Sequence, residues 1–378
     1  MPMFLTDDQV MLRDTAQPFI AEQAPISHMR KLRDAQDATG FSRDLWAQFA
    51  EMGFTGILID EADGGLGMGH VEAGIVLEEI GRNLTPSPLL STAVGAVTAL
   101  KQGSVEQRGH WLPGILTGTT VAALAVDESA KHRPNHIALA AERDGNGFKL
   151  TGNKTFVAHG HVADLIIVAA RTAGAAADAD GITLFAVERG AAHLTVRPER
   201  LADASLASRL VFEGVHVDAD AVIGHVDNGR EGLTRILNAL RTGAASEMLG
   251  VGNGAMAMTV NYLKERKQFG KLIGSYQALQ HRAAHLYAEM EVARASVLKA
   301  QQLLDAGDER AERAVLVAKS MTGYAMQLSV QEGIQMHGGI GMTDEYDIGL
   351  FMKRQRVLGE FCGDSDFHAH ALAQLMGY

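Results

Sequence analysis

Residues 262–281 read YLKERKQFGKLIGSYQALQH, a basic segment that runs into the start of a helix. Arg266 can place two N–H groups on phosphate oxygens, because a guanidinium is a planar fork. We expect Ser275 to be the N-cap of the following helix, and the free N–H groups of a helix start favour an anion. Taken alone, the four cations between residues 264 and 271 would more often form a solvated surface.

A second segment, residues 331–343, reads QEGIQMHGGIGMT. Gly338 and Gly339 have no Cβ, so the backbone there can approach a ligand closely. The same pair is typical of a helix C-cap, and both interpretations can hold together.

Helical periodicity surrounds both segments. Apolar residues repeat at intervals of four and three over residues 233–262 and 279–297, which predicts a bundle of long helices. Such seams also serve oligomers. Helical spacing over residues 6–118 predicts an α-helical first domain, with a tight glycine-rich loop at residues 63–69.

Between the helical parts, β-branched and apolar runs predict strands. The runs lie at residues 121–126, 137–141, 148–150, 165–169, 182–187 and 210–217. Residues 144–147, Asp-Gly-Asn-Gly, predict a tight hairpin because they tolerate positive φ, so the strands should be antiparallel. The Ala-, Gly- and Asp-rich residues 172–181 predict a surface loop.

Composition excludes several classes of protein. The formal net charge of −11 argues against non-specific binding to nucleic acid. The single cysteine, Cys362, can form neither an intrachain disulfide nor a multi-thiolate metal site, which favours a reducing compartment, so we expect the cytoplasm. No apolar run reaches the roughly 20 residues that a membrane helix needs, and residues 1–8 do not resemble a secretory signal.

The two segments, with the order helical domain, β domain, helical bundle, resemble the acyl-CoA dehydrogenase family along essentially the whole chain. The resemblance implies an α+β multidomain fold: an N-terminal α-helical domain (1–119), a middle antiparallel β domain (120–226) and a C-terminal four-helix bundle (227–378). It implies FAD as cofactor and α,β-dehydrogenation of an acyl-CoA thioester. It also implies electron-transfer flavoprotein as electron acceptor, and a homotetramer or an α2β2 heterotetramer with a related chain.

The resemblance carries cofactor roles to individual residues. In the family, the first segment holds the FAD pyrophosphate and reaches its sugar chain, and the second meets the adenosine part of an FAD held mainly by a neighbouring subunit. The cofactor residues expected on this basis are Arg266, Gln268, Phe269, Gln277, Gln280, Gln335, Gly338 and Gly339 from the helical part, and Val126 and Phe156 from the β part.

Two segments depart from the family pattern. Residues 126–132 read VDESAKH where the family's flavin loop usually reads Thr-Glu-Pro-x-Ala-Gly-Ser-Asp. In residues 152–158, Phe156 replaces the usual Trp beside the flavin and Ala158 the usual Thr. A phenyl ring can still cover a flavin face, but the threonine hydroxyl is missing.

Dehydrogenation needs a base for the α-proton. The family's usual Glu position holds Cys362 here, and its second position, just before Arg241, holds Leu240. Glu247 is the expected base: it lies on a helical stripe with Gly243, Gly250 and Gly254, a groove for close approach that allows a roomy pocket. Its neighbours Met248 and Val251 are apolar, which would raise the pKa of its carboxyl group.

Other assignments stay open. A bacterial subgroup that includes steroid side-chain degrading enzymes also carries a Glu in an Ala-Glu-Met-Leu-Gly context, so a bulky acyl group is an option. Cys362, Glu360 and Asp364 are competing bases, and Arg241 is expected to contact CoA or the catalytic carboxylate region. The competing functions are a non-catalytic or half-site subunit of a heteromeric dehydrogenase and a flavin monooxygenase or oxidase.

Three histidines invite a metal or base interpretation. His281 and His285 have i, i+4 ligand spacing, but no Glu-x-x-His pattern accompanies them, and His337 lies inside the second segment. A satisfied polar face is the favoured interpretation, and we expect no metal.

Overall fold

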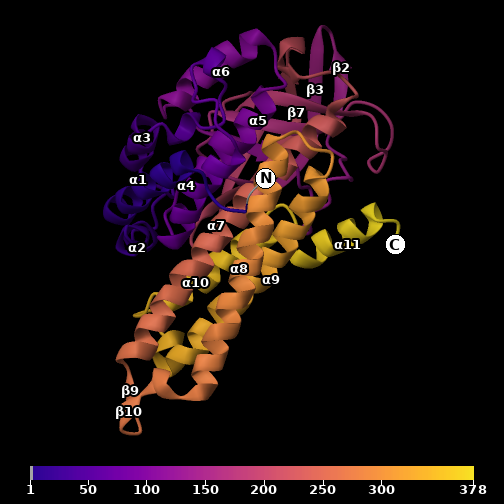
Figure 1. Cartoon of the computed structure of the whole chain (residues 1–378). Helices are drawn as coiled ribbons and strands as arrows, with labels where there is room; N and C mark the ends of the chain where they lie inside the picture. The colour runs from indigo at the N-terminus through magenta and orange to yellow at the C-terminus, as the bar shows by residue number, and fades with distance from the viewer. Residues whose placement is uncertain (1–2) are drawn as a thin grey trace. The chain divides into compact units, whose positions relative to one another are not determined.

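A computed structural model gives the structure of the chain and describes residues 3–378 (Figure 1). The chain forms two compact units. Unit 1 comprises Met1–Ala35, His70–Pro86 and Arg241–Tyr378, and unit 2 comprises Gln36–Gly69 and Ser87–Leu240. The division into three domains at residues 119/120 and 226/227 stays a prediction.

Unit 1 is helical. Its helices are α1 (Asp7–Gln23), α2 (Ile26–Asp34), α4 (His70–Arg82), α8 (Gln277–Asp305), α9 (Ala311–His337), α10 (Ile348–Glu360), α11 (Ser365–Leu375) and the larger part of α7 (Gly229–Glu265). The 3-10 turns η5 (Ile273–Ser275) and η6 (Gly338–Met342) and a hairpin of β9 (Lys267–Gln268) and β10 (Lys271–Leu272) complete it.

The predicted helical bundle is confirmed. Helices α7, α8, α9 and α10 share one core, because the four-and-three spacing places their apolar residues on facing stripes. Its buried members include Met248, Val251, Met290, Val297, Met326 and Phe351. Among residues 3–378, no helix combines the length and apolar character that a membrane span requires.

Helices α4 and α7 cross with their backbones in contact. A Cβ atom at Gly250 would lie 1.8 Å from the Glu78 carbonyl oxygen, and one at Gly81 would lie 2.0 Å from the Glu247 carbonyl oxygen. At Gly254 the space is filled by the ring of Phe351, whose Cε1 would be 2.4 Å from a Cβ. The prediction of a roomy pocket over this glycine stripe is therefore wrong at Gly250 and Gly254. The space beside Gly250 is filled by the backbone of α4, and the space beside Gly254 is filled by the ring of Phe351.

Unit 2 carries an eight-stranded sheet in the order β6-β7-β3-β2-β4-β5-β8, with β1 beside β4. The strands are β1 (Ala122–Ala125), β2 (Ala140–Asp144), β3 (Gly147–Ala158), β4 (Leu165–Arg171), β5 (Ile182–Glu188), β6 (Leu194–Arg200), β7 (Leu206–Val217) and β8 (Val222–Ile223). The hairpin at residues 144–147 is confirmed, since Asp144 pairs with Gly147 between β2 and β3. The sheet is antiparallel except where β1, and one residue of β2, run parallel to β4.

Helical segments also belong to unit 2. They are α3 (Arg43–Glu51), α5 (Val97–Leu100), α6 (Val105–Leu116), the first part of α7, the π-helix η3 (Leu90–Ala96) and the short turns η1 (Phe54–Gly56), η2 (Glu61–Asp63) and η4 (Ala219–Ala221). The sheet has its own apolar core, which includes Phe148, Leu150, Ile166, Val168, Phe185 and Phe212. This core fixes the strand ends from which the predicted flavin-facing residues come.

Candidate active site

The first segment forms the β9–β10 hairpin at the far end of α7 (Figure 1). The amide of Arg266 continues the helix with a 2.9 Å bond to the Tyr262 carbonyl, and the Arg266 carbonyl accepts from Ile273. Phe269, at the tip, has a positive φ of 51° and is 92% exposed. The hairpin therefore exposes Arg266, Gln268 and Phe269, so that they can contact a ligand or another molecule.

The helix after the hairpin does not begin as expected. Tyr276, not Ser275, is the N-cap of α8, and no side chain caps its first turn. Ser275 belongs to η5 and its hydroxyl donates to the Leu272 carbonyl at 2.7 Å. The expectation for Ser275 is wrong because the 3-10 turn delays the helix by one residue. Gln277 and Gln280 are exposed, and the Gln280 amide donates to the Gly274 carbonyl at 2.9 Å.

The second segment lies at the same end of the bundle. Met336, at the end of α9, packs with Leu263, Ile273 and Leu286 in a small core that joins α7, η5, α8 and α9. Gly338 ends α9 with a φ of 65°, which confirms the C-cap interpretation. The structure thus brings together the two sets of residues that sequence reasoning assigned to the cofactor.

Both segments fit a dinucleotide. Gln335, Gly338 and Gly339 are exposed, and a Cβ on either glycine would meet no atom of the described residues within 4 Å. Packing inside the chain therefore gives no reason for glycine at 339, whereas close approach of an external group does. The cations of the hairpin supply donors for phosphate oxygens.

His337 has a structural role. Its ring stacks on Tyr262 at 4.5 Å between centroids and lies 4.8 Å from Tyr346. Nδ1 donates to the Gly333 carbonyl at 2.6 Å, and burial lowers the pKa of His337, which that bond opposes. A neutral imidazole packed between two tyrosines fixes the end of α9 rather than acting as a base.

Val126 and Phe156 belong to unit 2. Val126 is buried, and Phe156 is half-buried at a register shift in β3, with a positive φ of 57°. Such a backbone is strained for an aromatic residue, and strain of this kind gathers at functional sites. The amide of Thr155 donates to the Asp127 carbonyl at 2.7 Å, so the altered loop and this strand are one structure.

A buried lysine that sequence reasoning missed holds the altered loop. Lys154 is fully buried, and its Nζ donates to the Val126 carbonyl at 2.9 Å and to Glu128 Oε1 at 2.7 Å. The Glu128 carboxylate also accepts from the amides of Ala138 and Leu139. The loop at residues 126–128 is therefore ordered by a buried ion pair although its sequence departs from the family pattern.

Glu247 lies in the middle of α7 and is 2% exposed. The apolar surroundings expected from Met248 and Val251 are incomplete, because Arg354 of α10 donates from Nε to Glu247 Oε1 at 2.8 Å. A guanidinium favours the ionised form of a carboxyl group, so the expected apolar setting does not describe this site. Arg354 is a second residue that sequence reasoning missed. It lies 107 residues after Glu247 in the chain, so no local spacing pattern indicated the pair.

Glu247 is remote from the hairpin of its own chain. Arg266 follows Glu247 by nineteen positions, of which the first eighteen belong to α7, so the two lie roughly 28 Å apart at about 1.5 Å per residue. The hairpin and Glu247 of one chain therefore cannot serve the same reacting atoms.

A buried cation, Lys319, stabilises the turn that contains Cys362, the residue at the family's usual base position. Lys319 of α9 is 1% exposed, and its Nζ donates to the carbonyls of Leu358, Gly359 and Gly363 at 3.0, 3.1 and 3.0 Å. Burial lowers the pKa of Lys319 to about 8. Cys362 lies in this turn with a positive φ of 55° and is 8% exposed. No signal in the sequence distinguished Lys319 from a surface lysine.

Arg241 lies against the same turn. It is 5% exposed, donates from Nε to the Cys362 carbonyl at 3.2 Å, and its guanidinium is 5.7 Å from the centroid of the Phe367 ring. Whether Arg241 contacts CoA or the catalytic carboxylate region stays a prediction. The competing bases Glu360 and Asp364 flank the turn in sequence, and Asp364 caps α11 through the Phe367 amide.

Residues 3–378 contain no group of three or more His, Cys, Asp or Glu side chains placed to hold a metal ion. His285 pairs with Glu289 one turn along α8 at 3.4 Å. This contact is the satisfied polar face that the favoured interpretation describes.

Three family models match consecutive parts of the chain. Residues 6–119 match the acyl-CoA dehydrogenase N-terminal domain, 126–215 the middle domain and 227–377 the C-terminal domain. The chain belongs to the acyl-CoA dehydrogenase family. It is an oxidoreductase with FAD as cofactor, and the expected fold is confirmed.

Named relatives match along nearly their whole length. Acyl-CoA dehydrogenase FadE12 of Mycobacterium tuberculosis is 29% identical over 93% of this chain and 91% of its own. The mitochondrial isovaleryl-CoA dehydrogenase of Pongo abelii is 30% identical over 96% of this chain and 87% of its own.

Solved structures with the same fold also match the chain along nearly its whole length. One described as "Tcur3481-Tcur3483 steroid ACAD" has a TM-score of 0.89 and 28% identity, covering 98% of both chains. The fold is also that of PigA in its FAD complex, with a TM-score of 0.91, 22% identity, and coverage of 100% of this chain and 99% of that one.

Proposed function

We propose that this chain catalyses FAD-dependent α,β-dehydrogenation of an acyl-CoA thioester, with Glu247 as the base. The observation that carries the proposal is a buried carboxylate paired with Arg354, on the first helix of the bundle of an acyl-CoA dehydrogenase. A carboxylate must be ionised before it can take a proton.

The chain's own residues then have separate tasks. Glu247 removes the α-proton, and Arg354 orients its carboxylate through the bond from Nε to Oε1. FAD, when bound, accepts the β-hydrogen as hydride. Arg241 supports the turn at Cys362 and lies where the family's catalytic carboxylate region is expected.

The cofactor-holding role of the two segments is also a proposal. Arg266 and Gln268 bind the pyrophosphate, Phe269 packs on the cofactor, and Gln277, Gln280 and Gln335 reach its sugar parts. Gly338 and Gly339 allow close approach, while Val126 and Phe156 border the flavin. The exposure of the helical set and the strained, half-buried Phe156 support these roles.

Anaerobic titration with a panel of acyl-CoA thioesters tests the base. In Glu247→Gln, we expect acyl-CoA to bleach bound FAD about 100- to 10,000-fold more slowly than in wild type, the range that a positioned base contributes. Glu79→Gln is the matched control, because Glu79 is also 2% exposed and paired with an arginine, Arg82. If Glu247→Gln bleaches as fast as wild type, Glu247 holds the bundle together and is not the base.

A half-site subunit is the second candidate function. Cys362 at the usual base position and the altered loop at residues 126–132 favour it. A relative described by two paired names, Tcur3481-Tcur3483, makes an α2β2 assembly with a related chain a concrete option. Purified alone, a half-site chain would leave FAD unbleached by every acyl-CoA and recover activity with its partner; oxygen consumption by reduced flavin would instead indicate an oxidase or monooxygenase.

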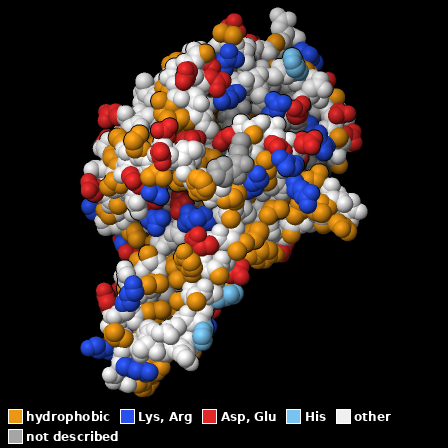
Figure 2. Space-filling model, in the orientation of Figure 1, with side chains coloured by type: hydrophobic (Ala, Val, Ile, Leu, Met, Phe, Trp, Pro, Cys, Tyr) orange, Lys and Arg blue, Asp and Glu red, His pale blue; other side chains and the backbone are white. Residues whose placement is uncertain are grey.

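We also propose that the chain assembles into a tetramer, which the proposed cofactor roles support. The hairpin is roughly 28 Å along α7 from Glu247, so each hairpin would serve a neighbouring subunit. The bundle also carries exposed apolar side chains, namely Tyr287, Val292, Tyr324 and Met342. Figure 2 shows hydrophobic side chains along the helical arm that ends in the hairpin.

Substrate, acceptor and compartment complete the proposal. The relative described as a steroid ACAD supports a steroid or otherwise bulky acyl-CoA, as against a simple fatty acyl chain. Electron-transfer flavoprotein is the proposed acceptor, supported by a neighbouring structure described under that protein's name. The single cysteine supports a cytoplasmic location.

A further inference from the structure

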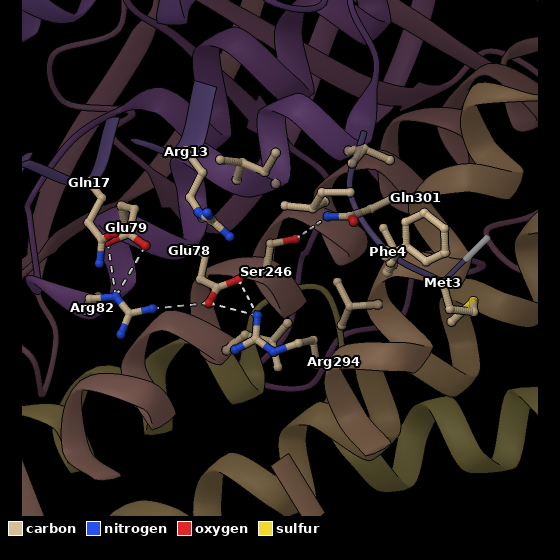
Figure 3. A pocket seen from close by; sticks show the side chains of 17 residues that line it. Met3, Phe4, Arg13, Gln17, Glu78, Glu79, Arg82, Ser246, Arg294 and Gln301 are labelled. Carbon is tan, nitrogen blue, oxygen red and sulfur yellow. Dashed lines mark hydrogen bonds and ion pairs between the residues drawn. The ribbon is translucent and has the colours of Figure 1, made fainter. Parts of the chain in front are cut away.

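Unit 1 contains a cavity of about 510 Å³ that the proposed reaction does not use (Figure 3). Its walls come from α1, α4, α7 and α8, and residues 3–5 form part of its rim. Glu247 does not line it, although its neighbour Ser246 does. The volume is within the roughly 300–1,000 Å³ that small-molecule sites occupy.

Three arginines and two glutamates line the cavity, so its formal charge is positive by one: Arg13, Arg82, Arg294, Glu78 and Glu79. Both glutamates already have donors. Arg294 Nη1 lies 2.9 Å from Glu78 Oε2, and Arg82 Nε lies 3.0 Å from Glu79 Oε2. Asn253 adds a 2.8 Å bond to Glu78 Oε1.

Guanidinium donors remain available. Within residues 3–378, neither Arg82 Nη1 nor Arg294 Nη2 donates to a protein acceptor, and Arg13 pairs only with its exposed neighbour Asp14. An exposed ion pair of this kind contributes little to stability, so Arg13 can exchange Asp14 for another anion at little cost. Figure 3 shows Arg13 reaching from α1 toward Glu78. The polar end of the cavity therefore has spare hydrogen-bond donors and its carboxylates are satisfied.

The rest of the cavity is apolar. The apolar lining residues include Phe4, Val71, Ile75, Leu249, Val297 and Leu298. The polar groups among them are internally bonded, since Gln301 Nε2 donates to Ser246 Oγ at 2.9 Å. An apolar chain would meet hydrocarbon here without stripping a polar group of its partner.

We propose that this cavity binds an amphipathic monoanion, a carboxylate attached to a medium-length hydrocarbon chain. The carboxylate accepts from the free guanidinium N–H groups of Arg13, Arg82 and Arg294, and the chain lies against Val71, Leu249 and Leu298. Charge-assisted bonds of this kind are among the strongest hydrogen bonds in proteins. The site does not depend on the proposed function, since it shares no residue with it.

Calorimetric titration of the FAD-loaded protein with octanoate tests the site. We expect one octanoate per chain, and about 10-fold weaker binding in Arg13→Gln because a charge-assisted bond is lost. Leu298→Trp, which fills the apolar end and leaves every charge in place, is expected to abolish binding. Arg313→Gln, on an exposed position of α9 outside the cavity, is the matched control and is expected to bind as wild type.

Ligand controls separate this site from general hydrophobic binding. Octyltrimethylammonium and 1-octanol carry a straight chain of similar length without the anion, and we expect at least 10-fold weaker binding for both. The proposal is overturned if wild type gives no octanoate heat, if both cavity variants bind octanoate as wild type does, or if the cation binds as tightly as the anion.

Discussion

Two buried lysines, one in each compact unit, hold turns that sequence reasoning linked to the reaction. Lys154 in unit 2 donates to the Val126 carbonyl and to the Glu128 carboxylate. Lys319 in unit 1 donates to three backbone carbonyls in the turn that carries Cys362. The first lysine has a carboxylate partner and the second has only carbonyl dipoles.

The two lysines therefore differ in the charges that offset the burial of their ammonium groups. Burial lowers the pKa of Lys154, but the Glu128 charge opposes that effect. Burial lowers the pKa of Lys319 to about 8, with the Cys362 charge opposing and Arg241 adding to the fall. The turn beside Cys362 is therefore held by a group that changes charge in the pH range of ordinary experiments.

Removing Lys319 should have the largest effect on stability. Lys319→Met removes a donor from the Leu358, Gly359 and Gly363 carbonyls, although Gly363 keeps the bond from His368 Nε2. We expect the free energy of unfolding to fall by about 4 kcal/mol. Urea unfolding at pH 7 measures the change. Lys353→Met, at an exposed position of α10, is the matched control; a loss equal to that of the control would mean that Lys319 does not hold the turn.

Removing Lys154 should cost somewhat less, because Glu128 keeps two backbone donors. We expect Lys154→Met to lower the free energy of unfolding by about 3 kcal/mol and to reduce the fraction of FAD retained after gel filtration. The double variant Lys154→Met/Glu128→Gln should recover part of the stability, because it removes the unpaired charge. Failure of the double variant to recover any would rule out the ion pair as the cause.

The smallest expected effect is the pH dependence of stability that Lys319 should give. Its folded pKa of about 8 lies below the unfolded value of 10.5, so between these pH values the unfolded chain binds more protons. Stability then rises with pH, and below pH 8 the penalty is constant. Relative to Lys319→Met, wild type should gain about 2 kcal/mol between pH 8 and pH 10. Unfolding curves at both pH values measure it, and a flat difference would contradict the assignment.

Much of the fold was accessible from local patterns. The four-and-three spacing along α7 and α8 and the Asp-Gly-Asn-Gly turn at residues 144–147 are local signals, and both predictions are confirmed. Strand β6 was missed because its residues are mostly polar and at least partly exposed, so it lacks the alternation of a half-buried strand.

The candidate site was less accessible, for a physical reason. Ion pairs such as Glu247–Arg354 and the carbonyl cage around Lys319 join residues that are far apart in the chain. Spacing within one helix showed that Glu247 shares a stripe with glycines, but not that another helix supplies a cation or fills the stripe. The delayed start of α8 at Tyr276 likewise depends on a 3-10 turn that the serine alone did not reveal.

The contact of α4 with α7 at Gly81 and Gly250 has a mechanical consequence. The carbonyls of Glu78 and Glu247 lie where methyl groups would otherwise be, so the two helices cannot slide past one another without steric collision. Glu78 lines the cavity and Glu247 is the proposed base, and the same touching backbones support both. A displacement of α4 would therefore displace the backbone of α7 at Glu247. We expect alanine at Gly81 or Gly250 to shift both Glu78 and Glu247.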